Sequence, residues 1–94
     1  MLGRMKSVVE RLRAEADHCY SWSNGPGATY AVHSHPYRKI LYVTAGSITF
    51  TPEGSLPVRM HPGDRIEIPP GTPHGALVGS EGVTCWEGQA RAPR

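Results

Sequence analysis

Apolar and polar side chains alternate along this chain in short runs, as in Arg65-Ile66-Glu67-Ile68. Successive side chains of a strand point to opposite faces, so each such run predicts a half-buried strand. The predicted strands cover residues 19–22, 28–35, 39–45, 47–51, 56–60, 65–68, 75–78 and 83–87. The first of these is expected at a sheet edge.

Glycine and proline clusters separate the runs, at 24–27, 52–55, 61–64 and 69–73. Such clusters mark turns, because these residues adopt or enforce turn backbone angles. The Gly79-Ser80-Glu81-Gly82 segment is predicted to join the last two strands as a closing hairpin. Short strands with turns between them indicate an all-β antiparallel sandwich or barrel.

Residues 1–18 are predicted to form a short helix. Val8, Val9, Leu12 and Ala16 fall on one apolar stripe at helical spacing, and Ser7 with Glu10 fits a capping box. The stripe predicts that the helix lies against the barrel or a second subunit, although a frayed helix without a role explains it equally well. After a barrel spanning 19–88, the polar residues 89–94 are expected to form a flexible tail.

The composition changes this picture little. A chain of 94 residues, 38% of them hydrophobic, forms one domain, 1–94, and often needs a partner subunit, so a homodimer is expected. A net charge of +2 is too small and too dispersed to favour nucleic acid or an anionic membrane surface as a partner, so we expect a small-molecule ligand or substrate instead. No secretory signal or membrane-spanning run is evident, so we expect a cytoplasmic protein with Cys19 and Cys85 as free thiols.

Three histidines are the candidate chemistry. His33 and His35 are two residues apart and share a face if the strand is regular. His74 follows a proline-rich turn, just after another predicted strand. A single histidine is more often a satisfied polar residue, but three neutral imidazoles in one cavity would suit a divalent transition metal.

Residues 27–78 resemble a small cupin of the type-2 kind, because two spaced motifs are kept. The first consists of Gly27, His33-Ser34-His35, Lys39 and Gly46, and the second of Gly63, Pro69-Pro70-Gly71, His74 and Val78. Lys39 stands where the family has a metal-binding Glu, and Val78 where it has Asn. The resemblance implies a double-stranded β-helix, the cupin jelly-roll barrel.

The resemblance also implies the metal ligands, which would be His33, His35 and His74. The ion could be Fe, Zn, Mn, Ni or Cu, and the motifs do not select one. His18 and His61 lie outside both motifs and are predicted at the surface.

Lys39 and Tyr37 are the candidate catalytic residues. Counting by twos from His35 places Lys39 inside, where an ammonium about 5 Å from a divalent ion is repelled by roughly 6–7 kcal/mol at an effective dielectric near 20. Lys39 could lose its proton, bend away, or bind an anion in a site without metal; a neutral lysine could also serve as a base or form a Schiff base. Extension of its ammonium to the barrel mouth is an equally good explanation.

Other side chains are weaker candidates for the site. Glu87 could replace the missing carboxylate if the face that it shares with Cys85 is interior, which the sequence does not decide. Pocket aromatics could come from Trp22, Tyr37, Tyr42, Phe50 and Trp86, although packing is the commoner role for each. Arg38 and Arg65 are expected to be solvated.

The function expected from the resemblance is that of a metalloenzyme, dioxygenase- or isomerase-like, acting on a small molecule. A non-catalytic cupin that binds or senses a small molecule is the alternative, and a structural dimer with a vestigial histidine cluster is a third. The fold does not select among these.

Overall fold

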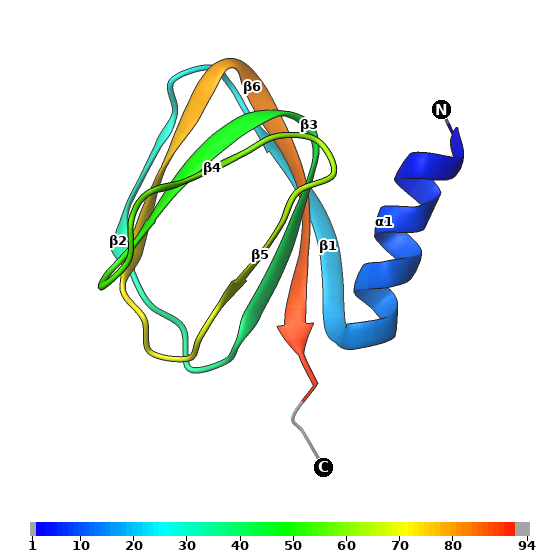
Figure 1. Cartoon of the computed structure of the whole chain (residues 1–94), viewed down its shortest axis with the longest axis horizontal. Helices are drawn as coiled ribbons and strands as arrows, with labels where there is room; N and C mark the ends of the chain where they lie inside the picture. The colour runs from blue at the N-terminus through cyan, green and yellow to red at the C-terminus, as the bar shows by residue number, and fades with distance from the viewer. Residues whose placement is uncertain (1, 92–94) are drawn as a thin grey trace.

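The computed structural model describes the backbone of residues 2–91 and the side chains from residue 7 to residue 91. One helix precedes six strands, arranged as a ring in Figure 1. In order these are α1 (Leu2–Glu15), β1 (Ala16–Asn24), β2 (Thr29–His33), β3 (Lys39–Pro52), β4 (Val58–Met60), β5 (Arg65–Ile68) and β6 (His74–Ala90). In this range no helix is long and apolar enough to cross a membrane.

The two longest strands, β3 and β6, are paired antiparallel from Lys39 opposite Gln89 to Pro52 opposite His74. Each half of this pair has its own outer neighbours: β1 and β5 beside one half, β2 and β4 beside the other. Because the long strands bend midway, the two halves face each other as two layers. This is the all-β double-stranded β-helix that the sequence predicts, with β1 at an edge.

Close backbone contact produces the bend. The β3–β6 register shifts on both sides of Ala45-Gly46, where Gly46 has φ 73°. A Cβ on Gly46 would overlap the carbonyl oxygen of Gly82, so only glycine fits there. The hairpin predicted at 79–82 is therefore wrong, because β6 runs through it. The predicted division of residues 39–51 into two strands at Gly46 is also wrong, because β3 is continuous there. These glycines mark a bend inside long strands rather than a chain reversal.

Apolar side chains of both layers fill the barrel. The buried cluster contains Leu41, Val43, Ile48, Phe50, Met60, Ile66, Ile68, Val78, Val83 and Cys85. The alternation predicted for 65–68 is confirmed, since Ile66 and Ile68 are buried while their neighbours are exposed. Phe50 of this core also lines the pocket described below, and the core as a whole holds the strands that position the pocket residues.

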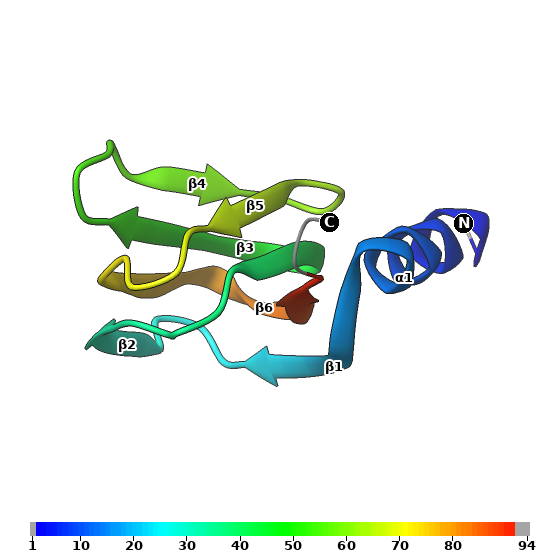
Figure 2. The same ribbon diagram turned by 90° about the horizontal axis from the view of Figure 1, so that it is seen from below.

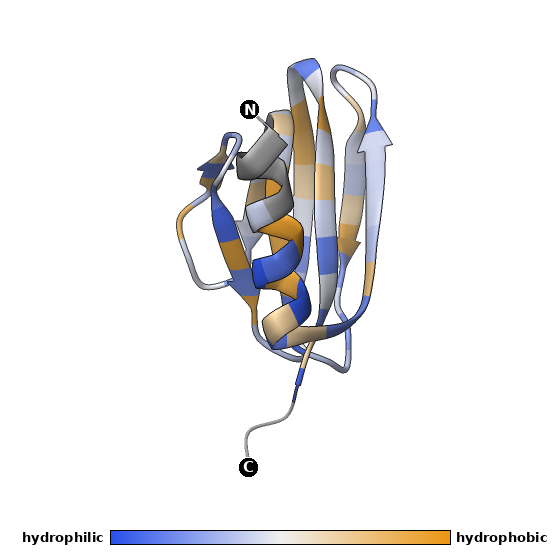
Figure 3. Cartoon of the chain, turned by 90° about the vertical axis from the view of Figure 1, so that its right-hand side faces the viewer, coloured by the Kyte–Doolittle hydropathy of each residue, from blue (hydrophilic) through white to orange (hydrophobic). Residues whose placement is uncertain are grey.

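The helix packs on the outside of the barrel, as Figures 1 to 3 show. Val8 and Leu12 of α1 are buried and cluster with Ile40 and Tyr42 of β3 and with Ala16, the first residue of β1. The predicted stripe is confirmed for Val8 and Leu12, whereas Val9 is only half-buried and Ala16 lies outside the helix. Of the two predicted contacts, the one with the barrel is observed. The predicted capping box is wrong, because α1 begins at Leu2 and Ser7 lies inside it.

Both ends of the chain differ from the predicted boundaries. The helix ends at Glu15 rather than 18, because Ala16 and Asp17 pair with Ala90 and Gln89 of β6. Gln89 and Ala90 thus belong to a strand and not to a flexible tail. Arg91 donates a hydrogen bond to the Asp17 carboxylate (3.1 Å), and residues 92–94 lie outside the described range.

Glu15 joins the end of the helix to the sheet. Its carboxylate accepts hydrogen bonds from the Tyr42 hydroxyl (2.7 Å) and from Arg65 (2.8 and 3.2 Å). Arg65 also forms an ion pair with Glu67 at 3.0 Å. The side chain that the sequence predicts to be solvated is therefore held between two carboxylates. The hydrogen bond from Arg65 lowers the pKa of Glu15 despite partial burial.

We predict that Glu15→Gln lowers the free energy of unfolding at pH 7 by about 1 kcal/mol, a modest value because the pair is about one-third exposed. Because folding lowers the pKa of Glu15, its carboxylate stabilises the fold above the ordinary glutamate pKa, and this contribution is lost as the pH falls through the folded-state pKa. The free energies of unfolding of wild type and variant, measured by urea unfolding, should therefore converge at acidic pH. Glu10→Gln, on the exposed face of the same helix, is the control; a constant difference at all pH values would contradict the assignment.

Candidate metal centre

Two paired strand ends and one loop bring the three histidines together. His33 ends β2 and lies opposite His74, the first residue of β6. His35 follows in the irregular segment before β3, where Pro36 cannot join a ladder. That segment is held in place because the Gly71 N–H donates to the His35 carbonyl at 2.7 Å. The strand pairing, which the sequence does not show, thus brings His74 to the H-x-H pair.

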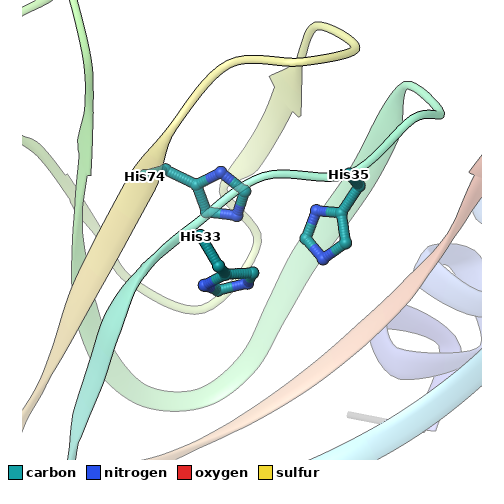
Figure 4. Close-up of side chains that lie close together, drawn as sticks. All are labelled: His33, His35 and His74. Carbon is teal, nitrogen blue, oxygen red and sulfur yellow. The ribbon is translucent and has the colours of Figure 1, made fainter.

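The imidazole rings face one another in a compact group (Figure 4). Their centroids are 4.6 Å apart for His33–His74, 4.8 Å for His33–His35 and 5.1 Å for His35–His74. One nitrogen of each ring lies within 4.8 Å of the other two. Metal–nitrogen bonds of about 2.0–2.1 Å place tetrahedral ligands about 3.3 Å apart, so small ring rotations would suffice to hold an ion.

Backbone carbonyls orient two of the rings. Nδ1 of His33 lies 2.8 Å from the Ala31 carbonyl, and Nδ1 of His74 lies 2.9 Å from that of Thr72. A carbonyl oxygen only accepts, so each Nδ1 donates and each Nε2 keeps its lone pair. This is the arrangement by which proteins orient metal-binding histidines.

The Nε2 of His74 is buried and has no hydrogen-bond partner within residues 2–91. His74 itself is 1% exposed. An unsatisfied buried nitrogen is costly, and a metal ion would satisfy it. The donor set therefore fits a divalent transition metal.

Burial also favours the neutral imidazoles that bind metals. The pKa of His35 and the pKa of His74 are both lowered, first by desolvation and then by nearby positive charge, to which Lys39 contributes. For His74 the hydrogen bond to Thr72 acts in the opposite direction. His18 and His61 are exposed, as predicted, and stand apart from this group.

The three rings line a cavity of about 340 Å³. Its other walls are Tyr20, Trp22, Asn24, Tyr30, Tyr37, Lys39, Phe50, Gly75, Ala76 and Glu87. Tyr37, Trp22 and Phe50 were predicted as candidates and do line it. Tyr42 and Trp86 instead pack with the helix on the opposite face.

Two tyrosines and one asparagine in this lining were not predicted from the sequence. Tyr20 could have been found, because it alternates with Trp22 along β1. Simple alternation along β2 does not place Tyr30 on the same face as His33. The two residues both line the cavity because the β2–β6 register shifts between them. The side-chain amide of Asn24, at the end of β1, donates to the Tyr30 hydroxyl.

Lys39 faces the cavity and is 7% exposed, so extension of the ammonium to solvent at the barrel mouth is wrong. Its Nζ lies 3.4 Å from Oε1 of Glu87, which is 4% exposed and shares the interior face with Cys85. This ion pair was not predicted from the sequence. Glu87 is also outside the group of possible metal ligands found within residues 2–91.

Neighbouring charges also influence the pocket tyrosines. Burial and the Glu87 carboxylate, which accepts the Tyr20 hydroxyl at 2.9 Å, raise the pKa of Tyr20 to about 12. Burial, then Glu87, raises the pKa of Tyr37, whose ring centroid is 4.9 Å from that of His35. Both phenols are therefore protonated at neutral pH.

We predict that the metal-free protein loses stability as pH falls below about 6.5, the ordinary histidine pKa. His35 and His74 bind protons more readily in the unfolded chain than in the folded protein, because folding lowers their pKa values. The free energy of unfolding therefore decreases as the pH is lowered, until the pH is below the folded-state pKa values. Urea unfolding with a chelator, from pH 7.5 to 5.5, measures this slope. His74→Gln should reduce the slope and exposed His61→Gln should not; an unchanged slope in His74→Gln would refute the assignment.

Two curated proteins are similar to half of this chain. Dimethylsulfoniopropionate lyase DddQ of Ruegeria pomeroyi is 42% identical over 48 residues, which are 51% of this chain and 24% of the relative. (R)-mandelonitrile lyase of Granulicella tundricola is 43% identical over 49 residues, 52% of this chain and 37% of the relative. The matched segments thus span between a quarter and just over a third of these relatives.

Solved structures extend the likeness to most of the fold. The structure of DddQ from Ruegeria pomeroyi superposes with a TM-score of 0.73 at 29% identity, over 78% of this chain and 37% of that one. A cupin-like protein of Thermotoga maritima superposes with a TM-score of 0.67 at 30% identity, over 76% of this chain and 55% of that one. The family model for the cupin domain matches residues 21–86, and the chain therefore belongs to the cupin family.

Proposed function

We propose that this chain binds one divalent transition metal through His33, His35 and His74 and acts as a lyase on a small organic molecule. The buried Nε2 of His74, which has no partner within residues 2–91, is the observation that most supports the metal. When bound, the ion would act as a Lewis acid that polarises an oxygen of the substrate. The metal is one of Fe, Zn, Mn, Ni or Cu, and imidazole ligands suit Fe, Zn, Ni and Cu better than Mn.

The reaction class is inferred from the named relatives. The sequence favoured dioxygenase- or isomerase-like chemistry, whereas both curated relatives are lyases. A lyase breaks a bond to carbon without water or an oxidant. It therefore needs a group that transfers a proton and a group that stabilises developing negative charge.

We assign these two roles to Tyr37 and Lys39, which both line the cavity. The raised pKa of Tyr37 keeps its hydroxyl protonated beside His35, so it can donate a proton. Lys39, which forms an ion pair with Glu87 at 3.4 Å, would stabilise negative charge that develops on the substrate. The cavity of about 340 Å³ limits the substrate to a small molecule.

Metal analysis is the direct test of the site. Protein purified without a metal-binding tag should contain about one divalent ion per chain, by plasma mass spectrometry. His33→Ala, His35→Ala and His74→Ala should each lower zinc affinity at least a hundredfold, because one of only three protein ligands is lost. His61→Ala should retain full affinity; a metal-free wild type that also fails to bind added metal would refute the site.

The same preparations test the reaction, with dimethylsulfoniopropionate and (R)-mandelonitrile as first probes. Tyr37→Phe and Lys39→Met should lower kcat at least tenfold while metal content is kept. Ligand binding by thermal shift without turnover of any probe would instead support the non-catalytic binding module.

We also propose that the chain works as a homodimer. β2 is an edge strand and its neighbourhood exposes Val32 (70%) and Leu77 (53%), which pairing of two copies would cover. Light scattering should give twice the chain mass at micromolar concentration, and a concentration-independent monomer mass would contradict it.

A further inference from the structure

A buried ion pair occupies the part of the site where the family's first motif supplies a carboxylate ligand. Lys39 stands at that motif position, and Glu87 reaches the same space from the neighbouring strand. In the β3–β6 register Lys39 lies opposite Gln89 and Leu41 opposite Glu87, so Lys39 and Glu87 are diagonal neighbours on one face. Their side chains are only 9% and 5% exposed.

The Glu87 carboxylate is held by two hydrogen-bond donors in addition to its ion pair with Lys39. Its Oε1 accepts the Trp22 indole N–H at 2.8 Å and its Oε2 accepts the Tyr20 hydroxyl at 2.9 Å. Both donors come from β1, on the opposite side of Glu87 from Lys39. With these bonds in place the carboxylate is a fixed counter-ion for Lys39 rather than a ligand that can turn toward the histidines.

Lys39 and Glu87 line the same cavity as the three histidines. An ammonium in that cavity would repel a metal cation held by the imidazoles. The Glu87 carboxylate, 3.4 Å from the Lys39 ammonium, opposes this repulsion.

We propose that Glu87 sets the metal affinity of this centre by neutralising Lys39 and not by ligation. The pair allows three neutral imidazoles to hold a divalent cation without the carboxylate ligand of the family motif. The bound ion then keeps its full +2 charge, which a carboxylate ligand would reduce. This inference rests on the metal site proposed above.

A double-mutant cycle tests the inference, because its two arms have opposite signs. Lys39→Gln leaves the negative charge of Glu87 uncompensated and should raise zinc affinity at least tenfold. Glu87→Gln leaves the ammonium uncompensated and should lower it at least tenfold, which corresponds to about 1.4 kcal/mol. The double variant Lys39→Gln/Glu87→Gln removes both charges, and its zinc affinity should lie within about threefold of that of wild type.

A surface ion pair between the residue before β3 and a residue of β5 offers a matched control. Arg38, next to Lys39 in sequence, pairs with Glu67 at 3.0 Å, and these side chains are 43% and 37% exposed. Arg38→Gln and Glu67→Gln make the same changes in net charge. At about 0.15 M salt they should change zinc affinity less than twofold, because exposed charges are screened.

Zinc affinity is measured on metal-stripped full chain at pH 7.5 by competition with a chromophoric chelator, with circular dichroism to confirm folding. A double variant that stays as weak as Glu87→Gln would overturn the inference and make Glu87 a ligand. Unchanged affinity in Lys39→Gln would overturn it even if Glu87→Gln did not fold. Failure of wild type to bind zinc would overturn the metal site itself, and this inference with it.

Discussion

The pairing of β3 with β6 is the interaction on which the rest of the structure depends. Each strand is long enough to belong to both layers, and each layer is completed by a shorter strand on either side of the pair. The bend requires glycine where Gly46 meets Gly82, because no side chain fits between the two backbones. The same pairing places Lys39 beside Glu87 at one end and begins β6 at His74 at the other.

The candidate site combines two groups of polar residues with different electrostatic characters. The histidines are oriented by backbone carbonyls and leave a buried nitrogen of His74 without a partner. The Lys39–Glu87 pair is almost as buried but is satisfied, since Tyr20 and Trp22 donate to the carboxylate. A buried charge without a partner would be far more costly than either arrangement. Removal of one member of the pair should therefore disturb the site more than removal of both.

Much of the site could be predicted from local spacing. H-x-H, the proline-rich turn before His74 and the family motifs were sufficient to single out the three histidines, but they left open whether Lys39 faces the cavity or the barrel mouth. The helical stripe and the strand at 65–68 were also predicted, because a period of 3.6 or 2 depends only on neighbouring residues. The hairpin predicted at 79–82 was wrong, because the conformational freedom of glycine serves both a turn and a bend within a strand, and the sequence does not distinguish the two.

The sequence by itself determined the family, the all-β class and which histidines share a motif. Only the tertiary structure decided which face of β6 is interior, and thus that Glu87 meets Lys39 and not solvent. It also decided that Tyr20 and Tyr30 line the cavity, through strand pairings over more than forty residues. The physical reason is that alternation separates the two faces of a strand but does not say which one is buried; that depends on the layer packed against it.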